Sequence, residues 1–135
     1  GYDETQAMIA RSFMISADNG HALHPNHGEY ADPVNAPRLN EGIVIKFNAQ
    51  QKYATDGFSA AFFRDLCRRA KVPTQTFTNR SDIPGGSTLG NISNTKVSIP
   101  TVDIGLPQLA MHSSYETAGT KDTAYMVMAC TAFFE

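Results

Sequence analysis

The residues best suited to chemistry lie in one short segment near the N-terminus. Asp18, His21 and His24 recur at every third position, and Gly20 lets the backbone bend between them. A carboxylate and two imidazoles are groups that bind metal ions or transfer protons. The apolar run just before them predicts a short buried strand, so these groups would follow directly from a strand end. The alternative is a loop that uses Asp, His and Gly only as turn formers.

Two further candidates are expected near the ends of strands. Lys46 lies in the β-branched run 43–47, and its ammonium can either reach solvent or project into a pocket beside Asp18. His112 follows another apolar segment, and a histidine without companions is more often structural than a ligand. If the strands that precede Asp18 and His112 are neighbours in one sheet, the groups at their ends converge across the top of that sheet.

Helices and strands alternate along the chain, and these elements must position the candidate groups. The predicted strands comprise residues 13–16, 43–47, 74–78 and 99–104. The predicted helices comprise residues 3–11, 56–69, a short one from 87, and a C-terminal one that Asp122 or Thr123 caps. This order predicts an α/β sandwich with helices on both faces of the sheet.

Two of these helices carry apolar residues that we expect to face the core. In the helix 56–69 these residues are Phe58, Ala61, Phe62 and Leu66, and in the C-terminal helix they are Ala124, Val127, Met128 and Phe134. The segment 28–41 is rich in Pro, Asn and Asp, which predicts a long irregular loop. Loops of this length are uncommon in a compact domain unless they line a site.

Composition limits the classes of function. The chain has 135 residues, enough for one domain, and its net charge of −2 offers no basic face for nucleic acid. It contains no apolar run of transmembrane length and no export signal, and it begins with Gly1, which suggests a processed or recombinant start. Cys67 and Cys130 are expected to be buried free thiols, as in a cytoplasmic protein, with a disulfide as the alternative.

Five segments carry a shared set of motifs. They are Asp18-x-x-His21-Ala22-x-His24-Pro25-Asn26, Gly42-x-Val44-Ile45-Lys46-x-Asn48, Lys52-Tyr53-Ala54-Thr55, Arg80-Ser81-Asp82-x-Pro84-x-Gly86-Ser87-Thr88-x-Gly90, and Gly105-x-Pro107-Gln108-Leu109-Ala110-Met111-His112-Ser113. In this order they resemble the aspartyl aminopeptidase family of dinuclear zinc exopeptidases. The resemblance implies a three-layer α/β/α sandwich of the zinc-peptidase (phosphorylase/hydrolase-like) type. It covers only the C-terminal part of a family member, so residues 1–135 would form the C-terminal portion of a catalytic domain.

The resemblance also implies roles for individual residues. Asp18 and His112 correspond to zinc ligands, one for each of two ions. His21 corresponds to a catalytic-site residue that contacts the substrate near the reacting carbonyl. Lys46 corresponds to the residue that pairs with the acidic side chain of the substrate, and Tyr53 supplies a hydroxyl in the same pocket. A partly buried ammonium favours an acidic partner, since without its anion it is itself penalised, so the implied substrate is a peptide with an acidic N-terminus.

Three further positions have lesser roles by the same resemblance. His24 is interpreted as structural, holding the loop before Pro25. Asp82 and the turn 86–88 are expected to shape the wall of the active site.

The remaining ligands of the family have no counterpart in this chain. An upstream His-x-Asp element, a bridging Asp and a Glu-Glu pair that contains the general base are all absent. One ligand for each zinc does not make a tight site, because such sites need roughly three or four protein ligands. We therefore expect the chain to bind zinc weakly or not at all, and to be inactive without the N-terminal portion of the enzyme. The resemblance also implies that the complete enzyme assembles into a large homo-oligomer. The alternative is a non-catalytic α/β module that binds a peptide or partner and keeps relic zinc positions.

Overall fold

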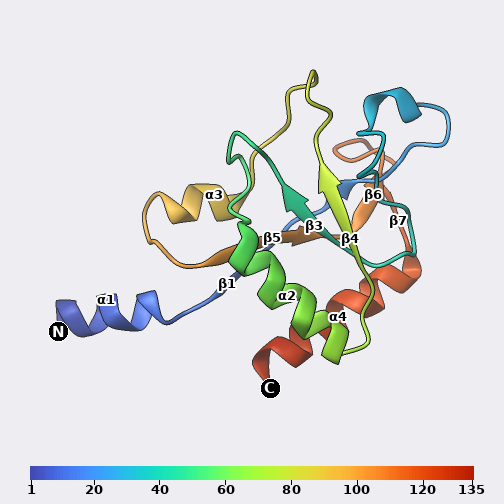
Figure 1. Cartoon of the computed structure of the whole chain (residues 1–135). Coiled ribbons are helices and arrows are strands. Elements are labelled where there is room, and N and C mark those ends of the chain that lie inside the picture. The colour runs from blue at the N-terminus through green and yellow to red at the C-terminus, as the bar shows by residue number, and fades with distance from the viewer.

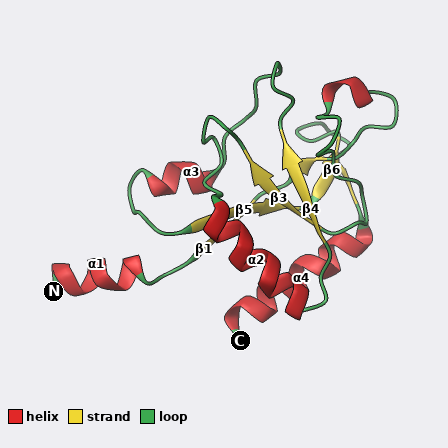
Figure 2. Ribbon diagram, in the orientation of Figure 1, coloured by secondary structure: helices red, strands yellow, loops and turns green.

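The computed structural model describes residues 1–135, and Figure 1 and Figure 2 show its arrangement. The helices are α1 (Tyr2–Ala10), α2 (Gly57–Arg69), α3 (Leu89–Asn94) and α4 (Thr120–Phe134), with a 3-10 turn at Gly28–Tyr30. The strands are β1 (Met14–Ala17), β2 (Gly20–His21), β3 (Ile43–Phe47), β4 (Thr74–Thr78), β5 (Thr101–Gly105), β6 (Pro107–Leu109) and β7 (Thr117–Ala118). All the predicted helices and strands are present, with ends that differ by a few residues.

The strands form two sheets. The main sheet has the order β1-β5-β3-β4, in which β1 pairs parallel to β5 and β3 pairs parallel to β4, whereas β3 and β5 are antiparallel. A smaller sheet, with the order β2-β6-β7, was not predicted because its strands are only two or three residues long. The main sheet is therefore mixed, and β1 and β3 run in opposite directions.

The apolar core lies on one face of the main sheet. Ile43 and Ile45 of β3 and Val102 and Ile104 of β5 point into it and are inaccessible to solvent. Val44 and Lys46 point to the other face, because successive side chains of a strand alternate. The β-branched run 43–47 is thus buried on both faces, which explains its nearly continuous hydrophobic sequence.

Helix α2 packs on the core face, but not with the predicted residues. Asp56 caps the helix by accepting a hydrogen bond from Ser59 N at 2.7 Å. The buried positions are Ser59, Ala60, Phe63, Leu66 and Cys67. Of the four residues expected to face the core, only Leu66 does. Phe58 and Ala61 are exposed, and Phe62 is also exposed, at the edge of the contact between α2 and the core. Phe62 and Phe63 are neighbours of equal hydrophobicity, and the position of the helix on the sheet decides which one is buried.

Helix α4 packs beside α2 on the same face, and its predicted inner face was also wrong. Ala124, Val127, Met128 and Phe134 are exposed, whereas Ala129 is buried and Tyr125, Met126, Ala132 and Phe133 pack against the core. The helix begins at Thr120, so Asp122 and Thr123 lie inside it and do not cap it. The carboxylate of the fully buried Asp122 instead accepts hydrogen bonds from Asn40 N (2.6 Å) and Gly42 N (3.0 Å), just before β3.

The opposite face of the main sheet carries α3 and several loops. Gly90 of α3 packs against Ser16 and Asp103, which lie on this face of β1 and β5. The sheet therefore has helices on both faces, as the sequence predicted. The loop 28–41 is irregular apart from its 3-10 turn, and α1 extends away from the body with no buried residue (Figure 1).

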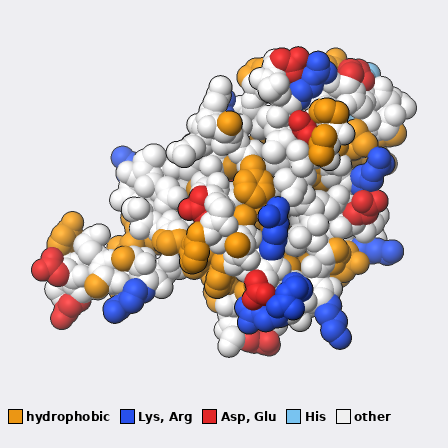
Figure 3. Space-filling view, viewed as in Figure 1, with side chains coloured by type: hydrophobic (Ala, Val, Ile, Leu, Met, Phe, Trp, Pro, Cys, Tyr) orange, Lys and Arg blue, Asp and Glu red, His pale blue; other side chains and the backbone are white.

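Surface charge and hydropathy agree with the expectations from composition. On the face shown in Figure 3, acidic and basic side chains are interspersed and form no field of one sign. No helix has the length and apolar character needed to span a bilayer. Both cysteines are free thiols, Cys67 fully buried and Cys130 partly so.

Candidate functional site

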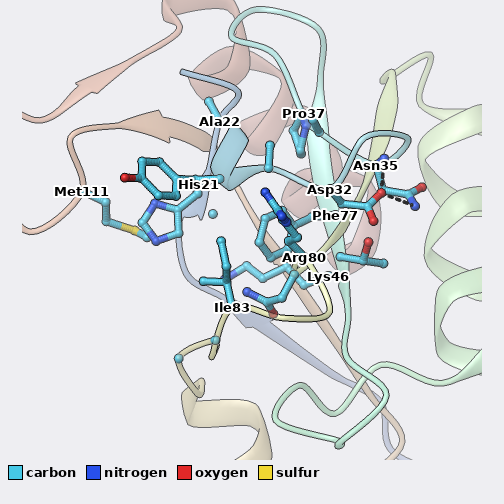
Figure 4. Close-up of a pocket in the computed structure, with 18 of the residues that line it drawn as sticks. His21, Ala22, Asp32, Asn35, Pro37, Lys46, Phe77, Arg80, Ile83 and Met111 are labelled. Atoms are coloured by element: carbon cyan, nitrogen blue, oxygen red, sulfur yellow. Dashed lines mark hydrogen bonds between the residues drawn. The ribbon is translucent and has the colours of Figure 1, made fainter. Parts of the chain in front are cut away.

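A cavity of about 490 Å³ lies over the face of the main sheet opposite α2 and α4. All five residues singled out in the sequence line it: Asp18, His21, Lys46, Tyr53 and His112. Figure 4 shows its walls, which come from the segment after β1, the long loop before β3 and the loop after β4. We call this cavity the pocket.

Asp18 and His112 reach the pocket from two neighbouring strands. Because β1 pairs parallel with β5, the carboxyl ends of the strands that precede Asp18 and His112 share an edge of the sheet, as predicted. Strand β3 is antiparallel to β5, so Lys46 reaches the same pocket from a strand that runs the other way. After β1 the chain stays beside β5 and the residues that follow it, since Asp18 N donates to Ile104 O at 3.0 Å and Gly20 N to Leu106 O at 2.9 Å. Gly105 permits a close approach there, because a Cβ atom at this position would lie 1.6 Å from the carbonyl oxygen of Asp18. Asp18 Oδ1 accepts a hydrogen bond from Asn19 N at 2.8 Å.

The second sheet brings the two histidines to the pocket. The parallel pairing of β2 with β6 places His21 beside Gln108, a few residues before His112. His112 has a left-handed backbone (φ 69°), and its N–H donates to Glu116 Oε1 at 2.6 Å. Desolvation in the pocket lowers the pKa of His21, and the nearby His112 and Lys46 lower it further. The His21 imidazole is thereby favoured in its neutral form.

A row of polar residues lies on this face of the sheet, beneath the pocket, and only Lys46 of the row lines the pocket itself. Ser16 pairs with Asp103, and the antiparallel register in which Ile45 faces Ile104 brings Lys46 opposite Asp103. Asp103 is fully buried, and its Oδ2 accepts a hydrogen bond from Ala54 N, while its Oδ1 has no partner. Ser16 Oγ accepts a hydrogen bond from Gly90 N at 3.0 Å. Neither Ser16 nor Asp103 was identified from the sequence, although an acidic residue between Val102 and Ile104 was a signal that this strand has a polar face.

Lys46 is the most deeply placed cation of the pocket. Its residue is 2% exposed, and Nζ donates to Asn19 O at 2.9 Å. Burial lowers the pKa of Lys46, while the carboxylates of Asp18 and Asp103 act in the opposite direction. The ammonium lies 5.6 Å from the centre of the Tyr53 ring. The prediction that Lys46 projects into a pocket beside Asp18, and not to solvent, is confirmed.

Tyr53 forms the wall next to this ammonium. Its ring is buried and packs against Phe77 with the ring centres 6.3 Å apart. Burial raises the pKa of Tyr53, and a hydrogen bond to Asn79 opposes that shift. The hydroxyl is thereby favoured in its protonated form.

The lesser predicted positions also lie at or beside the pocket. His24 Nδ1 accepts a hydrogen bond from Asn26 N at 3.1 Å, which holds the loop around Pro25 as expected. Gly86, Ser87 and Thr88 line the wall. Asp82 does not line the pocket, but it pairs with Arg80, which does.

The side chains present do not form a complete metal site. Asp18 and His112 can each donate one ligand, but the chain contains no group of three or more His, Cys, Asp or Glu side chains that could hold a metal ion. A closed zinc site needs roughly three or four protein ligands. The residues present therefore fit at most part of a zinc centre.

Comparison with known proteins identifies the class to which this fold and pocket belong. Residues 1–134 match the family described as aminopeptidase I zinc metalloprotease (M18), and the chain belongs to this family. The resemblance seen in the motifs is thus confirmed at the level of the M18 zinc metalloproteases. Among individual relatives, the chain is 49% identical over 132 residues to the probable M18 family aminopeptidase 2 of Stutzerimonas stutzeri, covering 98% of this chain and 31% of that protein.

Other relatives and solved structures agree. The probable M18 family aminopeptidase 2 of Clostridium acetobutylicum is 53% identical over 126 residues, which are 93% of this chain and 29% of that protein. The fold matches that of a chain in the cryo-EM structure of the Ape4 and Nbr1 complex with a TM-score of 0.94 and 40% identity, covering 96% of this chain and 25% of that chain. It matches the crystal structure of prApe1 with a TM-score of 0.92 and 30% identity, over 96% and 27% of the two chains. The chain spans roughly a third of the length of the curated relatives, 31% and 29% for the two named here.

Proposed function

We propose that this chain is the C-terminal portion of the catalytic domain of a zinc aminopeptidase that removes Asp or Glu from the N-terminus of peptides. The observation that carries this proposal is the ammonium of Lys46, buried at the floor of the pocket. A buried cation has lost most of its hydration, so a ligand carboxylate that pairs with it is favoured over a neutral group of the same size. The apolar and aromatic wall formed by Tyr53 and Phe77 strengthens that preference by excluding water.

The other pocket residues have complementary roles in this proposal. Asp18 would be a ligand of one of two zinc ions, and His112 would be a ligand of the other. His21 is the catalytic-site residue that contacts the substrate near the scissile carbonyl, and its neutral imidazole can donate a hydrogen bond there. The protonated hydroxyl of Tyr53 donates to the substrate in the same pocket.

The rest of the polypeptide supplies what this chain lacks. The remaining zinc ligands and the general base come from the N-terminal portion, so the chain alone is inactive. The dodecamer of mApe1, which is 29% identical to this chain with a TM-score of 0.85, supports assembly into a homo-oligomer. The two free cysteines support a cytoplasmic location, where thiols stay reduced.

Substitution of Lys46 tests the proposed specificity. In the complete polypeptide, we expect Lys46→Met to lower the preference for an aspartyl over an alanyl peptide at least about tenfold, or ~1.4 kcal/mol, through KM and kcat/KM. Lys52→Met is the matched control, because Lys52 donates to Gly85 O at 2.9 Å behind the wall and does not line the pocket. An unchanged preference in Lys46→Met would refute the assignment of acidic specificity.

A second measurement tests the zinc ligands separately. Elemental analysis of the purified complete polypeptide should show less bound zinc in Asp18→Ala and His112→Ala, and no loss in the surface variant Asp65→Ala. Full zinc content and full activity in both pocket variants would reject these ligands, whereas a complete polypeptide with no peptidase activity and no bound zinc would favour a non-catalytic module that binds peptides.

A further inference from the structure

Two loops that are far apart in sequence form part of the wall of the pocket. One is the long loop before β3, whose tip at 27–32 contains the 3-10 turn, and the other is the loop 79–88 after β4. Both contribute residues to the lining. An isolated backbone bridge, between Ala31 and Asn79, connects them near the main sheet. Because irregular loops have few contacts of their own, their position over the pocket depends on the contacts that join them.

Arg80 makes the side-chain contact between the two loops. Its guanidinium donates to the backbone carbonyl oxygen of Glu29 at the tip of the first loop. The same guanidinium pairs with Asp82 through both carboxylate oxygens, Nε to Oδ1 at 2.7 Å and an Nη to Oδ2 at 3.0 Å. Figure 4 shows Arg80 among the side chains that line the pocket.

In this arrangement two protein groups occupy the guanidinium, so little of its positive charge is available to a ligand. The flat fork of an arginine can hold a carboxylate with one edge and a carbonyl oxygen with another, which the point charge of a lysine cannot do. Asp82 neutralises the positive charge locally. We propose that Arg80 is a positioning residue that fixes the 27–32 tip over the pocket, and that it is not a receptor for the acidic group of a substrate.

The effect of this contact should be local. The side chains of Arg80 and Asp82 are 41% and 61% exposed, and exposed ion pairs contribute little to global stability. The tip itself has few internal bonds, among them Tyr30 N to His27 O at 3.4 Å and Ala31 N to Gly28 O at 3.1 Å. Loss of the Arg80 contact should therefore free the tip without unfolding the domain.

Hydrogen exchange tests the inference directly in the complete polypeptide. We expect the amides of Tyr30 and Ala31 to exchange about tenfold faster in Arg80→Met and in Arg80→Lys, because both lose the fork that reaches Glu29 O. Arg64→Met is the matched control, since Arg64 donates to Thr76 Oγ1 of β4 at 3.0 Å and does not line the pocket. Unchanged exchange at the tip in Arg80→Met would overturn the proposal. Asp82→Asn leaves the arginine in place but loosens its orientation, so it should give a smaller increase in the exchange rate of these amides. This variant replaces Arg80→Met as the test if Arg80→Met does not fold.

Kinetics separate a positioning role from a binding role, and this arm alone rests on the proposed peptidase function. In Arg80→Met, KM should rise by the same factor, about threefold or more, for aspartyl and alanyl peptides, with kcat little changed. A rise confined to the aspartyl peptide would show that Arg80 binds the acidic group and would overturn the proposal. If the complete polypeptide hydrolyses neither peptide, the proposed function fails, whereas the exchange experiment still decides the role of Arg80.

Discussion

The two faces of the main sheet are made from alternate residues of the same strands, yet they have opposite characters. On the face covered by α2 and α4, Ile43, Ile45 and Ile104 pack into an apolar core. On the other face, Asp103 and Lys46 lie side by side on neighbouring strands beneath the pocket. The comparison shows that a strand of five residues can place alternate side chains in the apolar core and the others, Lys46 among them, beneath or in the pocket.

The two faces should therefore respond differently to substitution. Changes on the core face should alter the free energy of unfolding and leave specificity intact. Changes on the pocket face, such as Lys46→Met, should alter specificity, because they remove the ammonium that lines the pocket.

The largest effect is expected at Phe63, the largest fully buried side chain of the core face. Phe63→Ala should lower the free energy of unfolding by about 3–5 kcal/mol, because it removes a fully buried ring and leaves a cavity. Phe58→Ala on the same helix is the control and should cost about 0.5 kcal/mol or less, since Phe58 is 65% exposed. Urea unfolding followed by circular dichroism measures both. Equal losses in the two variants would mean that the face of α2 has been assigned wrongly.

An intermediate effect on the free energy of unfolding is expected at Asp122, which joins α4 to the segment before β3. Asp122 of α4 accepts hydrogen bonds from Asn40 N and Gly42 N and so ties the core helix to the segment that enters β3. Asp122→Ala leaves buried N–H groups without a partner and should cost about 2–3 kcal/mol in the same urea experiment. Asp65→Ala, which removes an exposed carboxylate from α2, should change little. A loss as small as that of the control would show that water replaces the carboxylate.

The smallest effect concerns the chemical reactivity of the two cysteines and does not involve the free energy of unfolding. Burial on the core face raises the pKa of Cys67 to about 12, with a contribution from Cys130, so its thiolate is suppressed. At pH 8 roughly one thiol in ten thousand would be ionised, and the reactive species is the thiolate. Iodoacetamide followed by mass spectrometry should modify the partly exposed Cys130 first, and Cys67 only when the protein is unfolded or the pH is raised toward 12. Equal rates in the native protein would contradict the tight packing of the core face.

Much of the fold was predictable because local patterns determine it. The β-branched run 43–47 and the alternating 74–78 gave strands with the observed bounds. The inner face of α4 was not predictable, because apolar residues occur on all its sides and only the docking on the sheet selects Ala129 over Val127. On α2 the buried residues Ala60, Phe63 and Cys67 do follow a helical repeat, and the prediction chose the neighbouring set that contains Phe62. The pairing of β2 with β6 was also hidden, since strands of two or three residues carry no periodicity.

The candidate site was predictable as a set of residues and in part as a geometry. The five residues to which the resemblance gave a site role do line one pocket, and the strands before Asp18 and His112 are parallel neighbours. The sequence could not show that β3 runs the other way, so that Lys46 reaches the pocket from an antiparallel strand. Arg80 was not recognised as a pocket residue, and Asp103 was not recognised beneath the pocket, because their importance depends on partners distant in sequence, Glu29 and Ala54.

The close approach of Asp18 to Gly105 of β5 affects how mutational data for this protein should be understood. In a saturation library, position 105 should tolerate no side chain at all, and the usual interpretation of such a result is a turn that needs an unusual backbone angle. Gly105 does not have a positive φ, since Gly42 is the glycine for which that conformation is found. Its intolerance would instead record the passage of Asp18 directly above it. A single strict position would thus report, without any coordinates, that two distant parts of the polypeptide touch.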